Sequence, residues 1–234
     1  NELDTSALLT FCGGGDGAVT KWYDQSGNSQ DAYQNTNSVQ PIIVDSGVLN
    51  TDNGKPTLSL QGTQARMLLP NATFLYGQSH FFILSVANPT AAGGTVPTIY
   101  ASYTQNGYKA SLLYDFPSSQ RITVGGRRSS ADAFKFAQSD TNTINQQRLV
   151  VGHLNYSDGV ANLYENAINT ATNNDYYDSP MDSSTHPTND DNIGGIGTIQ
   201  EYDGNIQEII VYNTNEDANR AGMEENINSE YNIY

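Results

Sequence analysis

The sequence predicts an all-β protein in which two antiparallel sheets pack face to face as a sandwich. Short runs of apolar and β-branched residues recur roughly every ten to fifteen residues, as strands do in such folds. Glycine, asparagine and aspartate separate the runs, and their tolerance of positive φ suits tight hairpin turns. The turn signals are Asp52-Asn53-Gly54, Gln105-Asn106-Gly107, Ser157-Asp158-Gly159 and Tyr202-Asp203-Gly204.

The predicted strands differ in how many of their faces are apolar. Residues 160–164 and 205–209 alternate apolar and polar side chains, as expected for strands with one face on the core. Residues 149–151 are apolar on both sides, which indicates a strand in the middle of the stack. The predicted strands, in order, are 19–23, 41–44, 57–60, 81–87, 98–103, 109–114, 121–124, 148–154, 160–164 and 205–212.

One helix is predicted, close to residue 234. The segment 214–217 fits a capping box, and its acidic residues suit the first turn of a helix. Met223, Ile227 and Tyr231 then recur every four residues, so they would form one apolar stripe facing the sandwich. With no internal repeat and no linker in the chain, we expect a single domain over residues 1–234 with this short helix closing it.

The composition limits the partners of the protein. Ten Lys and Arg residues stand against 25 Asp and Glu residues, which gives a formal net charge of −15. Such a surface repels phosphate backbones and anionic lipids, so we expect no nucleic-acid partner. No apolar run approaches the roughly 18 residues that cross a bilayer, so we expect no membrane insertion. The high Asn, Thr and Tyr content with few Lys residues is typical of an exported protein on a cell or virion surface.

The segment "KWYDQSGN" (residues 21–28) holds the only tryptophan of the chain. Asp24 to Asn28 place oxygens at alternate positions, as calcium loops do, but the glycine and the bidentate glutamate of such loops are not in place. An Asx turn after a strand accounts for the same residues, and we favour it. Trp22 could anchor the core or serve as a sugar platform, and we favour the core. The glycine-rich segment 13–17 lacks the residues of a phosphate loop and is expected to be a flexible loop.

The three histidines do not form a recognisable metal motif. His80, His153 and His186 are scattered along the chain, and no two have the spacing of metal ligands. His80 and His153 lie within predicted strands, so we interpret them as structural residues whose hydrogen bonds are satisfied.

The long polar stretch 172–192 holds the best candidate binding residues. Sugar rings stack one apolar face on aromatic planes while their hydroxyls pair with carboxylates and amides, although a solvated polar loop has the same composition. The candidate carbohydrate-binding residues are Tyr176, Tyr177, Asp190, Asp191, Tyr202 and Asp203. Acidic residues crowded in one loop also suit a hard cation. The candidate calcium ligands are Asp175, Asp178, Asp190 and Asp191, with simple solvation as the alternative.

Two blocks of sequence resemble the catalytic domain of the fungal-type α-L-arabinofuranosidase B family. They are "FCGGGDGAVTKWYDQSGNSQDAYQ" and "IGGIGTIQEYDGNIQEIIVYNTNEDANRAGMEENINSEY", and together they cover about a quarter of the chain. The same blocks are similar to those of laminin-G-like modules in surface adhesins and phage virion proteins. The resemblance implies a concanavalin A-like jelly roll, in agreement with the predicted sandwich.

The residues that carry catalysis in the resembled family are not retained. Retaining glycosidases need two carboxyl groups about 5 Å apart. The family's acid/base aspartate follows an Ile-Gly-Gly, where this chain has Ile196, and its nucleophile position falls on Ala110 or Ser111. The adjacent cysteine pair of the family has no counterpart, and the position that would pair with Cys12 is Gly17. The resemblance therefore implies the scaffold without the active site.

We therefore expect a non-catalytic module that binds a glycan or surface polysaccharide, or that mediates adhesion. The alternative from the enzyme class is an arabinofuranosidase-like glycoside hydrolase with relocated carboxylates, for which Glu201 and Asp203 are the candidates. A third possibility is a purely structural domain of a virion or filament, whose partners would be other protein subunits.

Overall fold

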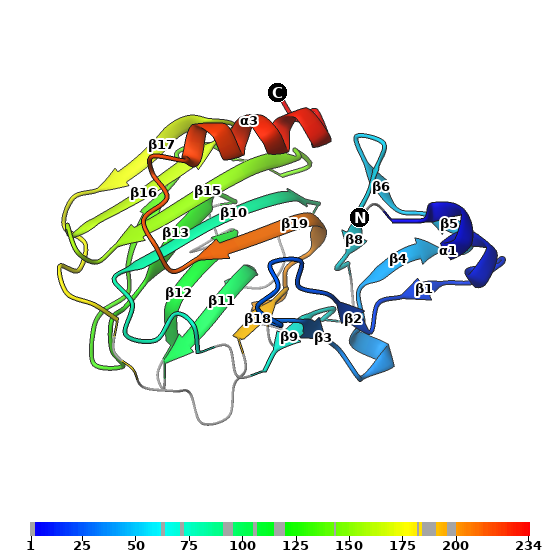
Figure 1. Cartoon of the computed structure of the whole chain (residues 1–234), viewed down its shortest axis with the longest axis horizontal. Helices are drawn as coiled ribbons and strands as arrows, with labels where there is room; N and C mark the ends of the chain where they lie inside the picture. Colours follow the sequence, from blue (N-terminus) through cyan, green and yellow to red (C-terminus); the bar gives the residue numbers. More distant parts are fainter. Residues whose placement is uncertain are drawn as a thin grey trace.

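Two antiparallel sheets, A and B, form the body of the protein and pack face to face (Figure 1). The structure, a computed structural model, describes residues 3–61, 64–70, 73–90, 96–104, 107–114, 120–142, 144–181, 183, 191–195 and 200–234. The sandwich of two antiparallel sheets predicted from the sequence is confirmed.

Sheet A is continuous from one end of the molecule to the other. Its strands, in spatial order, are β1 (Gly17–Ala18), β4 (Ile42–Asp45), β8 (Leu58–Ser59), β19 (Gly204–Tyr212), β10 (His80–Pro89), β15 (Arg148–Asn155), β16 (Val160–Glu165) and β17 (Ile168–Asn173), and β5 (Val48–Leu49) pairs with β4. Because β19 lies between β8 and β10, the last strand of this sheet in sequence joins the N-terminal strands to the rest of it.

Sheet B has the same antiparallel pairing. Its strands, in spatial order, are β14 (Lys135–Gln138), β13 (Ile122–Gly126), β12 (Gly107–Tyr114), β11 (Thr98–Thr104), β18 (Asp191–Ile193), β9 (Met67–Leu69), β3 (Ala32–Tyr33) and β2 (Lys21–Trp22). A separate hairpin consists of β6 (Thr51–Asp52) and β7 (Lys55–Pro56). A short 3₁₀ helix covers Asn37–Val39.

Strand β10 shows why its sequence is apolar on both faces. Successive side chains of a strand point to opposite faces. Phe81 and Ile83 therefore enter the core between the sheets, while Phe82 and Leu84 belong to a second apolar cluster on the outer face of sheet A. Ile227 of helix α3 (Arg220–Tyr231) covers this second cluster. Figure 1 shows α3 lying across the strands of sheet A.

Helix α3 begins later than the sequence predicts. Its N-cap is Asn219, whose side chain makes no capping hydrogen bond, and the predicted cap Thr214 instead donates its hydroxyl to the carboxylate of Glu216. The predicted apolar stripe is confirmed, because Met223, Ile227 and Tyr231 all pack on the outer cluster of sheet A. None of the helices among the described residues is long and apolar enough to cross a membrane.

The hairpin β6–β7 holds the C-terminal end of α3. The Lys55 ammonium lies 2.6 Å from the Glu230 carboxylate, and the Asn53 amide donates to the carbonyl of Asn232 at 3.0 Å. Both pairs are largely exposed, so they add little to the free energy of folding, and their main effect is to orient the end of α3. A hairpin from the first quarter of the chain thus holds the end of the last helix.

A second helix, α1 (Thr5–Cys12), was not predicted from the sequence. Asp4 caps it, because its carboxylate accepts a hydrogen bond from the Ala7 backbone N–H at 2.9 Å. None of its residues is buried. In Figure 1, α1, β1, β4 and β5 lie together at one end of the sandwich, away from β16 and β17.

The segment after Trp22 is an Asx turn, as predicted. The Asp24 carboxylate accepts hydrogen bonds from the backbone N–H groups of Ser26 and Gln30 at 2.8 and 3.0 Å. Trp22 is partly buried and packs against the main core, whereas Tyr23 is 62% exposed.

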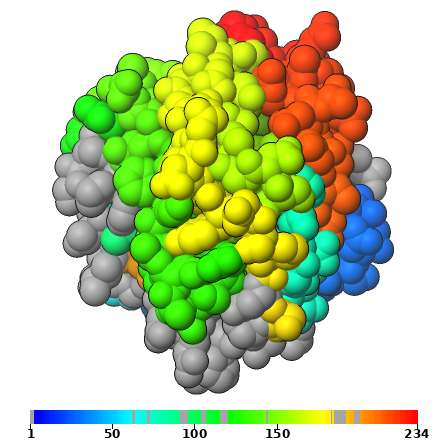
Figure 2. Space-filling model, turned by 90° about the vertical axis from the view of Figure 1, so that its left-hand side faces the viewer, coloured from blue at the N-terminus to red at the C-terminus, as the bar shows by residue number. Residues whose placement is uncertain are grey.

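The two sheets meet along the edge formed by β14 and β17. The Asn173 amide donates to the Phe136 carbonyl at 2.9 Å, and Lys135 forms a 3.2 Å ion pair with Asp175. Figure 2 shows these green and yellow segments side by side on the surface. The first part of the polar stretch 172–192 is therefore attached to the edge of sheet B.

Candidate functional site

An open polar cleft lies on the outer face of sheet A, at the N-terminal end of the sandwich. Its volume is about 380 Å³, at the lower end of the range for small-molecule sites. Its eight lining residues come from segments that are distant in the sequence: Asp16, Ile42, Asp45, Asn50, Thr51, Ser59, Gln61 and Asn205.

Strand register sets the floor of this cleft. Ser59 pairs with Ile42 of β4 on one side and with Asn205 of β19 on the other, so the three residues form one row across the sheet. Their neighbours Leu58 and Ile206 enter the main core. Because side chains alternate along a strand, the row of Ile42, Ser59 and Asn205 faces outward.

Two loops bring carboxylates to the rim of the cleft. The Ser46 backbone N–H donates to Asp16 Oδ1 at 2.8 Å, and the Ser46 hydroxyl donates to Asp45 Oδ1 at 2.9 Å. Each carboxylate thus has one oxygen held by Ser46, while its Oδ2 atom has no hydrogen-bond partner among the described residues. The two acidic side chains converge on Ser46 and keep a free acceptor each.

Glycine residues allow the two loops to approach. Gly47 has φ +81°, and a Cβ atom there would lie 2.9 Å from the Gly13 carbonyl oxygen. The Gly47 N–H donates to the Gly15 carbonyl at 3.0 Å. The glycine-rich segment 13–17, expected to be a flexible loop, is hydrogen-bonded to the turn between β4 and β5, and this contact positions Asp16.

The other polar groups of the cleft are only partly used within the protein. The Asn50 amide donates to the Ile42 carbonyl at 3.1 Å, and the Gln61 amide donates to the Thr90 hydroxyl at 3.2 Å. Their side-chain carbonyl oxygens stay available as acceptors, as do the hydroxyls of Thr51 and Ser59. None of the eight lining residues is cationic or aromatic. The cleft can therefore exchange many hydrogen bonds with a hydroxyl-rich neutral molecule.

Two of the predicted sugar-binding tyrosines are buried, so their prediction as stacking platforms is wrong. Tyr176 is 5% exposed, and its hydroxyl donates to the Tyr156 hydroxyl at 3.0 Å. Tyr202 is fully buried, and its hydroxyl donates to the Asn205 carbonyl at 3.3 Å. Both rings belong to the main core, where neither face is open to a ligand.

The other candidate binding residues are spread over the molecule. The half-buried ring of Tyr177 faces the cations of Arg128 and Lys135, and its hydroxyl donates to the Ala133 carbonyl. Asp203 is half-buried; burial raises its pKa, and the nearby Glu201 raises the pKa further. Asp190 lies outside the described residues.

The candidate calcium ligands do not converge. Asp175 and Asp178 are exposed, and Asp175 pairs with Lys135. Asp191 is 3% exposed and accepts long hydrogen bonds, 3.4 Å each, from the Tyr100 hydroxyl and the Tyr103 backbone N–H. In the part of the chain that the structure describes, no three His, Cys, Asp or Glu side chains are arranged to hold a metal ion. The proposed grouping of these aspartates is therefore wrong for its three described members.

The positions that the arabinofuranosidase resemblance implies hold no acid. Ala110 faces the main core. The hydroxyl of the buried Ser111 donates to the Gly125 carbonyl at 2.9 Å. Ile196 lies outside the described residues. Glu201, a candidate relocated carboxylate, accepts the backbone N–H of Gln64 at 3.0 Å.

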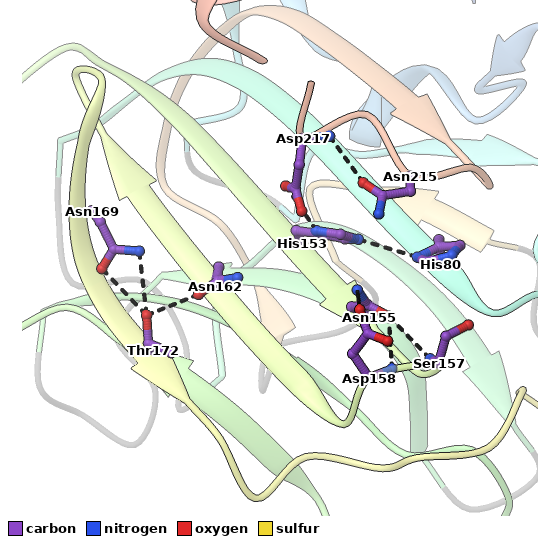
Figure 3. Close-up of polar contacts among 10 residues, drawn as sticks. All are labelled: His80, His153, Asn155, Ser157, Asp158, Asn162, Asn169, Thr172, Asn215 and Asp217. Atoms are coloured by element: carbon purple, nitrogen blue, oxygen red, sulfur yellow. Dashed lines mark hydrogen bonds and ion pairs between the residues drawn. The ribbon is translucent and has the colours of Figure 1, made fainter. Parts of the chain in front are cut away.

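A second polar cluster lies on the outer face of sheet A, beside α3 (Figure 3). His153 pairs in register with Phe82, and His80 with Asn155, so the two histidines become neighbours although 73 residues separate them. His80 Nδ1 lies 3.3 Å from His153 Nε2, and His153 Nδ1 lies 3.0 Å from Asp217 Oδ1. The interpretation of His80 and His153 as hydrogen-bonded structural residues is confirmed. His186 lies outside the described residues.

The hydrogen bonds in this cluster indicate which ring nitrogens of the two histidines carry a proton. Burial is the largest influence on the pKa of His153 and lowers it, while Asp217 raises it; the net pKa lies below 6.5, so His153 is neutral near pH 7. Its Nδ1–H then donates to Asp217, and its Nε2 accepts the Nδ1–H of His80. These hydrogen bonds attach the segment before α3 to sheet A. The polar groups of the cluster are used within the protein, which distinguishes the cluster from the cleft.

Comparisons with known proteins show the fold. No family model matches the sequence, and no curated protein matches it significantly. Among solved structures, the Trypanosoma rangeli sialidase in complex with the inhibitor DANA is similar over 87% of this chain and 30% of its own, with a TM-score of 0.54 and 14% identity. The NanB sialidase of Streptococcus pneumoniae is similar over 70% of this chain and 26% of its own, with a TM-score of 0.52 and 13% identity.

A carbohydrate-binding module is similar as well. The CBM40 of a Ruminococcus gnavus IT-sialidase, bound to α2,3-sialyllactose, matches 63% of this chain and 83% of its own, with a TM-score of 0.49 and 14% identity. The chain has a jelly-roll fold. Since it spans less than a third of either sialidase, and fold alone does not fix function, its activity has to be argued from the cleft.

Proposed function

We propose that this chain is a non-catalytic carbohydrate-binding module and that the cleft on sheet A holds the sugar. The observation that carries the proposal is the cleft lining, which offers two carboxylates, amides and hydroxyls with unused hydrogen-bonding capacity. A sugar hydroxyl both donates and accepts, so neighbouring carboxylate and amide groups can each satisfy part of it. The jelly-roll fold is compatible with this function.

The exposure of the two carboxylates favours binding over hydrolysis. A glycosidase keeps its general acid protonated by placing it in an apolar, buried environment. Asp16 and Asp45 are both exposed at the rim of the cleft. A pair of this kind suits hydrogen bonding to a bound sugar better than proton transfer to a leaving group.

A glycan array tests the proposal. Binding of the wild-type chain to a glycan should weaken by about tenfold in the Gln61→Ala or Asn205→Ala variants, since losing one good hydrogen bond costs roughly 1 kcal/mol or more. Asn174→Ala is the matched control, because Asn174 is exposed beyond β17 at the opposite end of sheet A. Silence across a broad array, or binding that the cleft variants leave unchanged, would overturn the proposal.

The composition supports an exported location as part of the same proposal. An acidic, lysine-poor surface with abundant Asn, Thr and Tyr suits display on a cell or virion, where adhesion to a surface polysaccharide would be the role. Secretion of the native protein, tracked with an antibody in cell fractions or purified virions, checks this part separately.

A glycoside hydrolase is the second candidate, favoured by the environment of Asp203. Burial and the neighbouring Glu201 both raise the pKa of this carboxyl, and such shifts recur at catalytic acids. Thr90 connects Asp203 to the cleft, because its N–H donates to the Asp203 carbonyl and its hydroxyl accepts from Gln61. Release of arabinose from a chromogenic arabinofuranoside, abolished by Asp203→Asn, would favour this candidate over simple binding.

Assembly into a virion or filament is the third candidate, favoured by the apolar surface around α1. Phe11 and Leu3 are 89% and 45% exposed, and Val48 on the neighbouring β5 is 68% exposed. Exposed apolar side chains gathered in one region often mark contacts between proteins. Sedimentation of the purified chain as a regular oligomer, lost in Phe11→Ser, would favour this role.

A further inference from the structure

We infer that the cleft selects neutral glycans and discriminates against sialylated ones. The inference rests on the proposed function and adds the class of sugar that the cleft accepts. Two of its eight lining residues, Asp16 and Asp45, are anionic, and none of the eight is cationic. The chain as a whole carries a formal charge of −15. A negatively charged sugar would therefore enter an already negative site.

The positions of the two carboxylates make this repulsion local. Both are held at Ser46, one through its backbone N–H and the other through its hydroxyl, so they stay together at the rim. Their free oxygens can only accept hydrogen bonds while they are ionised. A hydroxyl of a neutral sugar supplies the matching donor, whereas the carboxylate of a sialic acid supplies another acceptor and a like charge.

Recognition of a carboxylate sugar would call for a different lining. Arginine is the usual partner, because its guanidinium offers paired donors in a fixed geometry. Among the described residues, most cations outside the cleft have acidic or aromatic partners of their own, and the Arg66 guanidinium donates to the Gln64 carbonyl at 3.2 Å. Lys55 pairs with Glu230, and Lys21 pairs with Asp31. The cleft thus has no lining group that compensates a sialate charge.

The size of the effect follows from the exposure of the two aspartates. At a separation of about 4 Å in water, the repulsion between two unit charges corresponds to roughly a fivefold loss of affinity. Two carboxylates together give on the order of tenfold or more at low ionic strength. Salt screens exposed charges, so the discrimination should shrink at high ionic strength.

An array of matched pairs tests the inference. Each pair contains one neutral oligosaccharide and its sialylated form, such as lactose and α2,3-sialyllactose, probed with the whole chain at low and high salt. We expect every bound neutral member to bind on the order of tenfold more tightly than its sialylated partner at low salt. The difference should narrow at high salt.

Two double variants identify the source of the discrimination. Asp16→Asn/Asp45→Asn should narrow the difference between neutral and sialylated members, because it removes the charges of the cleft and keeps its shape. Asp140→Asn/Asp178→Asn removes the same charge from exposed positions at the opposite end of the sandwich, and it should preserve the difference.

The outcomes separate the inference from the proposed function. If no glycan binds, the proposed function fails and the inference falls with it. If glycans bind and the sialylated members bind equally well or better, the inference is wrong while carbohydrate binding stands. A preference for neutral sugars that survives in Asp16→Asn/Asp45→Asn also overturns the inference, because the charges of the cleft would then not be its cause.

Discussion

His153 Nδ1 lies 3.0 Å from Asp217 Oδ1, so a fully buried imidazole of sheet A is bonded to a partly exposed carboxylate in the segment before α3. The environment of His153 also includes His80, which lowers its pKa, and Asp158, which raises it. Burial is the largest of these influences, and the net effect is a pKa below 6.5.

Stability should therefore depend on the protonation of His153. The unfolded chain binds a proton on this residue more readily than the folded chain does. The free energy of unfolding should fall as the pH drops below about 6.5 and continue to fall until the folded-state pKa is passed. Urea unfolding between pH 7.5 and 5 measures this loss, which should be smaller in His153→Gln.

Titration by NMR isolates the contribution of Asp217. Removing its charge in Asp217→Asn should lower the pKa of His153 further, because Asp217 favours the charged imidazole. Asp140→Asn, which changes an exposed carboxylate, serves as the control. An unchanged or raised His153 pKa in Asp217→Asn would contradict the assignment of this contact.

Asp191 should give the opposite dependence on pH. Burial raises its pKa from 3.8 to about 7, so the folded state holds a proton that the unfolded state releases. Its contribution to stability is complete below pH 3.8 and is lost as the pH rises through 7. Asp191→Asn mimics the protonated form. As the pH rises from 5 to 8, the free energy of unfolding of this variant should increase relative to that of the wild type by about 2–3 kcal/mol.

The control for this effect is an exposed carboxylate of the same kind. Asp178→Asn should change the free energy of unfolding by the same amount at pH 5 and at pH 8, because Asp178 is exposed. Parallel pH curves for the wild type and Asp191→Asn would show that the Asp191 carboxyl is already ionised in the folded state.

Two glycines should respond in opposite directions to alanine. A Cβ at Gly152 would lie 2.6 Å from Val124 Cγ2 inside the sandwich, so Gly152→Ala should destabilise the fold by about 1–3 kcal/mol. A Cβ at Gly222 in α3 meets no atom within 4 Å, so Gly222→Ala should stabilise by about 0.5–1 kcal/mol. Thermal denaturation of both variants measures these changes in stability. A Gly152→Ala protein as stable as the wild type would contradict the close packing of β15 on β13.

Gly17 and Cys12 should accept an engineered disulfide. A Cβ at Gly17 would lie 2.8 Å from Cys12 Sγ, close to the geometry of a bonded pair. Gly17→Cys should therefore oxidise to a disulfide and stabilise the fold by about 2 kcal/mol, given the short loop. Mass spectrometry and melting with and without reductant measure both effects.

Gly17→Ser is the matched variant, since it adds a side chain of similar size without the bond. If Gly17→Cys stays reduced in air, or is no more stable than Gly17→Ser, the approach of α1 to β1 differs from the one described.

The long strands could be predicted from the sequence because their apolar runs are longer than those found in turns. Residues 81–87 and 148–154 fall within β10 and β15. Helix α1 was missed because its eight uncharged residues span little more than two turns, too few for a clear periodic pattern, although Asp4 is a suitable N-cap residue. The N-terminal strands of two residues are too short to show any periodicity.

The site was harder to predict because it depends on strand register. Ser59 and Asn205 meet only because β8 pairs with β19, and nothing in either segment indicates this pairing. Tyr176 and Tyr202 were chosen for their polar neighbours, but sequence composition does not show which residues of a polar segment turn inward. Asp16 was overlooked because its glycine-rich surroundings predicted a flexible loop.

The position of β19 between β8 and β10 has a consequence for synthesis on the ribosome. Residues 58–59 and 80–89 emerge well before residues 204–212, by on the order of ten seconds at usual translation rates. During that interval both strands expose unpaired edges, and such edges recruit chaperones or other nascent chains. The cleft also needs Asn205 for its floor. A nascent chain halted before this strand would thus lack both a complete sheet A and a complete cleft, so translation must pass residue 212 before either can form.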